Sequence, residues 1–161
     1  MIGNDGKPVS SNKMFFLERP RLGDLLTRKG LVTSDQLSVA LAESQESGEL
    51  LGRVLIRRGY LFDHDLARIL AEQLDLPYVD IAVVGVDRSV ARMLSIEEGR
   101  RAAAIPVAVI RGRVRVVFAD PCDETSRSIV DRYMPATYEA AVGELSLIES
   151  EWNRIELENR G

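Results

Sequence analysis

The sequence predicts an α+β fold. Duplicated helical hairpins form a four-helix array, followed by a small α/β sandwich with a short three-stranded sheet. Two observations carry this prediction. Residues 21–44 and 50–73 repeat each other with helical periodicity, and the second half of the chain changes to β-rich runs separated by turn residues. We therefore divide the chain into a flexible arm (1–18), a tandem-motif helical subdomain (19–77) and a small α+β subdomain (78–161).

The repeat is an internal duplication, because nine of 24 aligned positions are identical when the chain is shifted by 29 residues. In each copy the first helix is expected to stop at a glycine, Gly30 or Gly59, which adopts the left-handed conformation at little cost. The identical pairs that recur below are Leu22 with Leu51, Gly23 with Gly52, Leu26 with Leu55, Gly30 with Gly59, Leu37 with Leu66, and Leu41 with Leu70.

The second helix of each copy is expected to begin at a capping residue. Thr33 and Gln36 have the spacing of a capping box in copy one, and Asp63 is the predicted N-cap in copy two. The inner faces predicted from the periodicity are Leu37, Ala40, Leu41 and Ser44 in copy one, and Leu66, Ile69, Leu70 and Gln73 in copy two. After Pro77, residues 78–84 (YVDIAVV) are expected to be extended and to close this unit.

The second half predicts a hairpin, a third strand and several capped helices. Two β-rich runs, 103–110 and 113–119, are joined by Arg111-Gly112, which suits a tight turn, and residues 136–142 are the predicted third strand. The expected caps are Asp87, Ser95 (with Glu98) and Asp123, and the expected final helix runs from Glu144 to Glu156 with Leu145, Ile148, Trp152 and Ile155 facing inward.

Composition excludes several classes of function. The net charge of −4 disfavours DNA or RNA as a general partner, and no apolar run is long enough for a transmembrane segment. The start of the chain lacks a signal-peptide pattern, which predicts a cytoplasmic protein. Cys122 and His64 are the sole residues of their types, so neither a disulfide nor a typical metal site is expected.

No enzyme motif is present. The sequence lacks a P-loop, a G-x-G-x-x-G fingerprint and a G-x-S-x-G elbow. His64 lies at a predicted helix start between two aspartates, where a solvated turn residue is the ordinary interpretation. We therefore expect no catalytic residues, no metal and no required cofactor. Within the arm, residues 14–17 (MFFL) are an apolar cluster that suits docking onto the domain or a partner, and an expression scar is an alternative interpretation.

The repeat has a structural and a ligand-binding interpretation. Leu and Gly can keep their places in both copies simply because duplicated hairpins pack against each other. However, Gly23 and Gly52 lie near helix starts, where glycine costs about 1 kcal/mol relative to alanine. Glycine there suits close approach by a ligand, and helix starts offer free N–H groups to anions. Arg19 and Arg21 flank the first of these starts.

The residues that carry a family resemblance are Arg21-Leu22-Gly23, Leu26 and Gly30-Leu31-Val32 in copy one, and Leu51-Gly52, Leu55, Gly59 and Gln73 in copy two. Over roughly residues 20–155 the chain resembles the MshEN-type domain, the N-terminal domain of type II secretion and type IV pilus assembly ATPases (GspE-like, PilB-like). The segments LDLPYVDI (74–81) and ADPCD (119–123) extend this resemblance.

The resemblance implies that cyclic di-GMP is a candidate ligand, with each motif gripping one half of the two-fold dinucleotide. An arginine can stack on guanine or bond its O6/N7 edge, and a glutamine amide can read a base edge. Leucines would form an apolar bed, while Arg19 and Asp120 would assist. The implied ligand-binding residues are Arg19, Arg21, Leu22, Gly23, Gly30, Leu37, Leu41, Ser44, Leu51, Gly52, Gly59, Leu66, Leu70, Gln73 and Asp120.

The sequence departs from the family pattern at two positions. The second motif begins with Leu50 instead of arginine, and the first ends with Ser44 instead of glutamine. Each lost base contact is worth roughly 1–3 kcal/mol, so together they would weaken binding by on the order of 10²–10⁴-fold. Arg53, Arg57 and Gln45 lie within a turn of the lost groups and are candidate substitutes.

Two functions therefore remain open. The first is a non-catalytic regulatory or interaction module that binds cyclic di-GMP and biases a secretion or pilus ATPase. The alternative is a ligand-free docking module that holds an inner-membrane assembly component. The expected partners are that ATPase and inner-membrane platform proteins, which would place a cytoplasmic domain at the periphery of the inner membrane. A catalytic domain is disfavoured.

Overall fold

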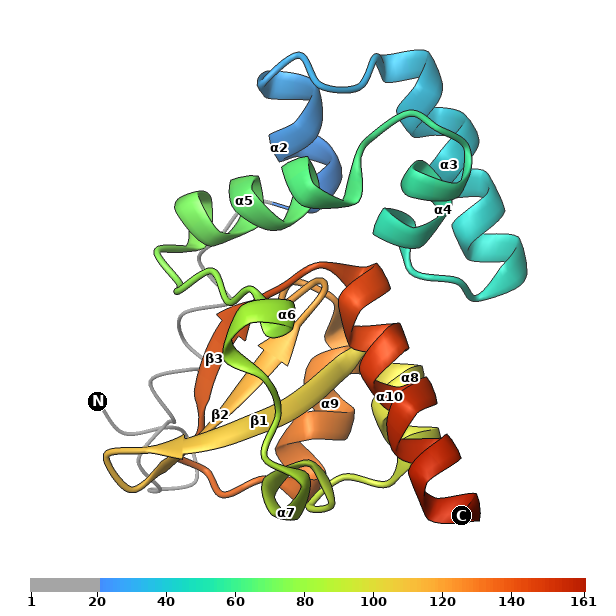
Figure 1. Cartoon of the computed structure of the whole chain (residues 1–161). Coiled ribbons are helices and arrows are strands. Elements are labelled where there is room, and N and C mark those ends of the chain that lie inside the picture. The colour runs from blue at the N-terminus through green and yellow to red at the C-terminus, as the bar shows by residue number, and fades with distance from the viewer. Residues whose placement is uncertain (1–20) are drawn as a thin grey trace, which may run out of the picture.

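The computed structural model describes residues 21–161. The predicted arm (1–18) and Arg19 lie outside the described residues. Four helices stack on one end of a layer built from a sheet and further helices (Figure 1). The elements in order are α2 (Leu22–Arg28), α3 (Ser34–Ser47), α4 (Leu51–Arg57), α5 (Asp63–Leu74), α6 (Ile81–Val84), α7 (Arg88–Ala91), α8 (Ile96–Ala102), β1 (Ala104–Ile110), β2 (Arg113–Phe118), α9 (Glu124–Tyr133), β3 (Glu139–Val142) and α10 (Leu145–Arg160).

The two copies of the repeat form α2–α3 and α4–α5, which confirms the four-helix array. Their first helices end in the same way. Gly30 and Gly59 have φ angles of 71° and 73°. The next residue in each copy donates its N–H back into the helix, from Leu31 to the Leu26 carbonyl and from Tyr60 to the Leu55 carbonyl, both at 3.0 Å. This bonding closes both helices with the glycine-dependent motif that the sequence predicts.

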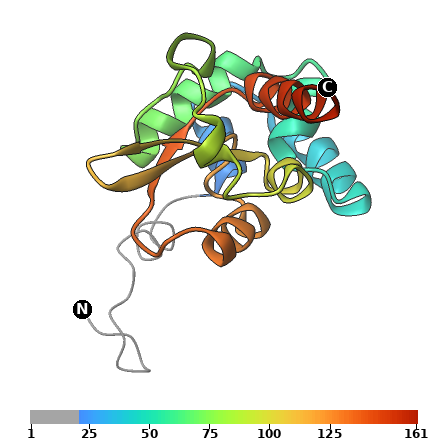
Figure 2. The same ribbon diagram turned by 60° about the horizontal axis from the view of Figure 1, so that its bottom comes forward.

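The sheet has the order β1-β2-β3, with β1 antiparallel to β2 and β3 parallel to β2. Arg111 and Gly112 form the hairpin turn with φ angles of 53° and 78°, as expected for a two-residue turn between twisted strands. The third strand begins at Glu139, three residues later than predicted. In both views the β1–β2 hairpin projects away from α10 (Figures 1 and 2).

The prediction of an extended segment over 78–84 is wrong for its second half. The Asp80 carboxylate accepts a hydrogen bond from the N–H of Ala82 and caps the four-residue helix α6. Ile81 is 1% exposed, because it packs in the core of the α+β subdomain. The β-branched run favours a strand, but the cap and the buried Ile81 stabilise a helical turn instead.

The caps predicted at Asp87, Ser95 and Asp123 are confirmed, since each side chain accepts a backbone N–H of its own helix. The capping box of Thr33 and Gln36 is confirmed as well. The cap predicted at Asp63 is wrong. Helix α5 has Phe62 at its N-cap without a side-chain bond, and the Asp63 carboxylate instead accepts hydrogen bonds from the start of α10.

Two apolar clusters form the core. One lies within the helical array and also contains Val142 of β3, and the other lies between the sheet and its helices. The predicted inward face of α10 is confirmed, with Trp152 only 1% exposed and its Nε1 donating to the Ala104 carbonyl at 2.9 Å. Within residues 21–161, no helix combines the length and apolarity that crossing a membrane requires.

Candidate ligand site on the tandem motifs

The glycines at the motif starts pack against a leucine of their own copy. A Cβ on Gly23 would lie 3.0 Å from Leu37, and a Cβ on Gly52 would lie 2.9 Å from Leu66. The two leucines are themselves 29 positions apart, so the duplication has kept the same contact twice. Glycine therefore has a packing role at both positions, because the close approach of the two helices within each copy leaves little room for a Cβ.

The predicted leucine bed is mostly buried inside the helical array. Leu22, Leu66 and Leu70 are 5%, 3% and 0% exposed, while Leu37 and Leu51 are half-buried. Leu41 was expected on the inner face of α3, but it is 39% exposed. The physical reason is position in the array. Helix α5 packs against β3, whereas α3 contacts chiefly α4 and leaves one side to solvent.

The polar candidates lie at three different places around this cluster. Arg21 is exposed at the N-cap of α2 and forms no ion pair within residues 21–161. Gln73 is half-buried in the last turn of α5. Asp120 lies in the turn after β2, and Cys122 of the same turn packs against the helical cluster. The structure thus brings the Asp120 turn to the tandem motifs, but Arg21, Gln73 and Asp120 do not line one of the hollows described below.

The two positions that depart from the family pattern have structural roles. The Ser44 hydroxyl donates to the Glu49 carbonyl at 2.6 Å and so closes the loop between the copies. Leu50 is half-buried and packs against the core of the α+β subdomain. Two of the three candidate substitutes are also engaged, since Arg53 pairs with Glu149, and Arg57 pairs with Glu43 and Glu49.

A hollow of about 450 Å³ lies at the start of the second motif, between the copy junction and the α+β subdomain. Its size is that of a small-ligand site. Three arginines line this hollow. Two of them, Arg100 and Arg101 of α8, are not among the site residues predicted from the sequence, because nothing in the repeat points to that helix. The full lining is Ser47, Gly48, Glu49, Leu50, Arg53, Arg100, Arg101, Asp123 and Thr125.

These arginines can contribute to anion binding because their present ion pairs lie at the surface. Arg100 bonds Asn153 and Glu156, and Arg101 bonds Glu98. Exposed pairs of this kind contribute little free energy and exchange readily for a better partner. A phosphate in the hollow would offer such a partner, and its charge would suit all three guanidinium groups.

Asp120 is an unusual carboxyl for a turn because it is only 6% exposed. Burial raises the pKa of Asp120 to about 6, although its oxygen accepts the N–H of Cys122 at 2.9 Å. The charge of Asp123 raises this pKa further, and Arg127 lowers it. A buried carboxylate of this kind gains most from a ligand that supplies N–H donors, as the guanine edge does.

We expect the Asp120→Asn substitution to remove a pH dependence of stability. The pKa of Asp120 in the folded protein is about 6, above its ordinary value of 3.8. Protonation of Asp120 therefore stabilises the fold fully below pH 3.8, and this stabilisation is lost as the pH rises through about 6. The wild type should therefore lose roughly 3 kcal/mol of unfolding free energy relative to the asparagine variant across this range. Urea titrations of both proteins between pH 4 and 7.5 would measure the difference, and parallel profiles would contradict the assignment.

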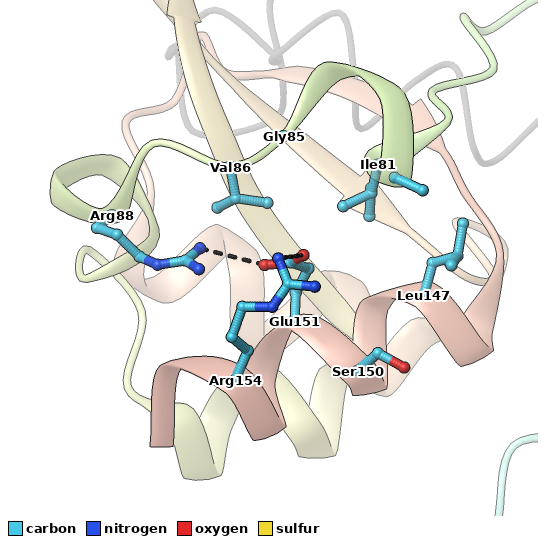
Figure 3. A pocket seen from close by; sticks show the side chains of 9 residues that line it. Ile81, Gly85, Val86, Arg88, Leu147, Ser150, Glu151 and Arg154 are labelled. Carbon is cyan, nitrogen blue, oxygen red and sulfur yellow. Dashed lines mark hydrogen bonds and ion pairs between the residues drawn. The ribbon is translucent and has the colours of Figure 1, made fainter. Parts of the chain in front are cut away.

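Two further hollows lie away from the motifs. One of about 360 Å³ separates α6 from α10, where Arg88 and Arg154 flank the buried Glu151 and bond one oxygen each at 3.1 Å (Figure 3). The other, of about 540 Å³, lies on the sheet between Tyr78 and Ile110. No group of three or more His, Cys, Asp or Glu side chains in the described part of the chain could hold a metal ion.

A duplicated helical array stacked on a small α+β layer with a three-stranded sheet is the class of fold that residues 21–161 form. The chain belongs to the MshEN domain family, whose model matches residues 74–160, more than half of its length. The chain is homologous to N-terminal domains of the ATPases PilB, XpsE and MshE. The type IV pilus assembly ATPase PilB of Thermus thermophilus is 39% identical over 103 residues, which are 63% of this chain.

Other relatives and solved structures support the same family assignment. PilB of Myxococcus xanthus is 27% identical over 101 residues, again 63% of this chain. The chain spans 11% and 18% of the length of these two curated relatives. Among solved structures, that of MshE with cdg has 30% identity and a TM-score of 0.65, covering 85% of this chain and 99% of that one. The N-terminal domain of XpsE has 25% identity and a TM-score of 0.67, covering 92% and 98%.

Proposed function

We propose that this domain is a regulatory module that binds cyclic di-GMP through its two tandem motifs and biases a secretion or pilus-assembly ATPase. The observation that carries the proposal is the likeness to MshE with cdg, the abbreviation for cyclic di-GMP. That match covers 85% of this chain, so it extends well before residue 74 into the tandem motifs. In this proposal, the duplicated helix starts would each contact one half of the two-fold ligand.

The chemistry of the proposed site is divided between the copies. Arg21, which forms no ion pair within residues 21–161, would stack on one guanine or bond its O6/N7 edge, and Gln73 would read the other half of the ligand with its amide. Asp120 would accept the N1–H and N2–H₂ donors of guanine. The arginines of the hollow beside Leu50 would face the phosphates. Because the chain lacks the second arginine and the first glutamine, we expect micromolar rather than tighter affinity.

The proposed partners follow from the relatives. We place the domain in the cytoplasm, acting on a pilus or secretion ATPase at the periphery of the inner membrane through platform proteins. Cyclic di-GMP is a regulatory ligand in this proposal and no cofactor is required.

We expect calorimetric titration with cyclic di-GMP at physiological salt to show binding that Arg21→Ala abolishes. Arg28→Ala is the matched control, because Arg28 is an exposed arginine of the same helix, and it should bind as the wild type does. Equal losses in both variants would mean that the arginines act through net charge alone. Absence of heat at high protein concentration would refute the ligand proposal.

Such a result would favour the second candidate function, a docking module for an inner-membrane assembly component. The observation behind it is that Ser44 and Leu50 have structural contacts in place of ligand-reading groups. In addition, Val83 and Val84 of α6 are 79% and 64% exposed, and Val84 lines the hollow beside Tyr78. We infer that this exposed aliphatic pair belongs to the docking surface in the second candidate function.

A further inference from the structure

The second copy of the repeat differs from the first at the residues that open its second helix. Copy one reads Thr33-Ser34-Asp35-Gln36, and Thr33 and Gln36 close the start of α3 with a capping box. Copy two reads Phe62-Asp63-His64-Asp65 at the equivalent positions. Phe62 cannot cap and is 78% exposed, so its own burial does not explain the change. Copy two has lost the local cap that copy one keeps.

The residue that replaces Ser34 caps a different helix. The Asp63 carboxylate accepts the N–H groups of Leu145 and Ser146, each at 2.9 Å, and also the hydroxyl of Ser146. These are the first two amides of α10, which have no acceptor within their own helix. The N-terminus of α10 is therefore capped by a side chain of α5, which lies 82 positions earlier in the chain.

The contact is reciprocal, because the N-cap residue of α10 bonds back to α5. The Glu144 carboxylate lies 2.9 Å from Nδ1 of His64 and accepts the Tyr78 hydroxyl at 2.8 Å. The hydrogen bond with His64 is the first cause that holds the pKa of Glu144 below its ordinary value. Arg68, one turn further along α5, lies over the Tyr78 ring at 5.4 Å. Two adjacent residues of α5, Asp63 and His64, thus bind three consecutive residues at the start of α10, from Glu144 to Ser146.

Helix α5 is also the second helix of the second motif. Leu66 packs on Gly52 at the start of α4, and Gln73 lies ten residues beyond Asp63, about 15 Å along the same rigid helix. Any ligand that pulls on Gln73 or on the start of α4 therefore acts on the helix whose first turn holds α10. The first copy has no counterpart of this contact, since α3 closes its own start.

We propose that Asp63 is a positioning residue that couples the tandem motifs to α10, so that ligand occupancy at the motifs changes the stability of the first turn of α10. The ligand half of this inference rests on the proposed function, whereas the contact itself does not. Coupling of this kind is reciprocal, so loosening α10 also changes ligand affinity. The first turn of α10 is then the part of the domain whose stability responds to the ligand.

Amide hydrogen exchange at Leu145 and Ser146, measured by NMR, tests the contact without ligand. Asp63→Ala should speed exchange at both amides at least about fivefold, because their acceptor is lost. The matched control is Asp65→Ala, which removes an exposed carboxylate from the same turn and should leave both rates unchanged. Asp63→Asn keeps one acceptor and serves if the alanine variant does not fold. Unchanged rates in the Asp63 variants would overturn the proposal.

Saturating cyclic di-GMP then tests the coupling. In the wild type the ligand should change exchange at Leu145 and Ser146, and in Asp63→Ala it should still bind but leave these two amides unaffected. A bound ligand that never alters the wild-type rates at these amides would overturn the coupling. If the wild type gives no binding heat at all, the proposed function and the coupling both fail, while the ligand-free rates still decide whether Asp63 holds α10.

Discussion

Restoring the two missing motif residues, by Leu50→Arg together with Ser44→Gln, is expected to tighten cyclic di-GMP binding by on the order of 10²–10⁴-fold. Each substitution returns one base-reading group at the position where the other copy has it, Arg21 or Gln73. A bidentate base contact contributes roughly 1–3 kcal/mol, and about 1.4 kcal/mol corresponds to a tenfold change in affinity. Calorimetric dissociation constants of the wild type, the two single variants and the double variant measure the gain.

The controls separate the new contacts from the loss of old ones. Ser44→Ala removes the hydrogen bond to Glu49 without adding an amide, and Leu50→Met keeps an apolar side chain on the core. Neither should tighten binding. If the double variant binds no better than these controls, the motif positions do not face the ligand and the site assignment is contradicted.

The second large effect is expected in the core, where Gly99→Ala should destabilise the fold by about 3 kcal/mol. A Cβ on Gly99 of α8 would lie 2.2 Å from Cζ2 and 2.3 Å from Cε2 of the buried Trp152. The indole would have to move, and its hydrogen bond to the Ala104 carbonyl would be strained. Overpacking a dense core typically costs about 1–3 kcal/mol, and the shift of a hydrogen-bonded indole places this site at the upper end.

The sign of this effect is informative, because alanine in a helix would otherwise be about 1 kcal/mol more favourable than glycine. Urea unfolding of Gly99→Ala measures the cost. In a Trp152→Phe background, which removes the atoms nearest the new methyl group, the same substitution should cost clearly less. A Gly99→Ala protein as stable as the wild type would show that α8 and α10 are not packed as closely as described.

The features that the sequence predicts correctly are local. The glycine stops of α2 and α4, the capping box at Thr33 and the tight turn at Arg111-Gly112 each depend on residues within one turn of each other. Their geometry follows from backbone preference and from side chains that reach their own helix. The glycine stop is present in both copies of the repeat, so the sequence predicts it twice and the structure has it twice.

The features that the sequence misses depend on distant contacts. Asp63 has the right type and place for a cap, but the amides it binds are 82 and 83 positions away. Periodicity places Leu41 on the apolar face of α3, yet it does not say that copy one lies at the outside of the array. The run after Asp80 favours a strand until its cap and the burial of Ile81 are known.

The candidate site also combines features that the sequence predicts with features that depend on distant contacts. The repeat identifies Arg21, Gln73 and the departures at Leu50 and Ser44, because these are differences between two copies of one pattern. Arg100 and Arg101 belong to a helix outside the repeat, and they come near the second motif only because the fold places them and the start of α4 around one hollow. The glycines, in contrast, proved to be packing residues as much as ligand candidates.

The central claim is that both copies of the motif contact one cyclic di-GMP. An NMR titration of the full chain with the nucleotide, following the backbone amides of Gly23 and Gly52 together with the side-chain amide of Gln73, tests it most directly. We predict that all three signals shift with the same dissociation constant, at one nucleotide per chain. Shifts confined to one copy, or to the hollow between α6 and α10, or no shifts at all would contradict the account.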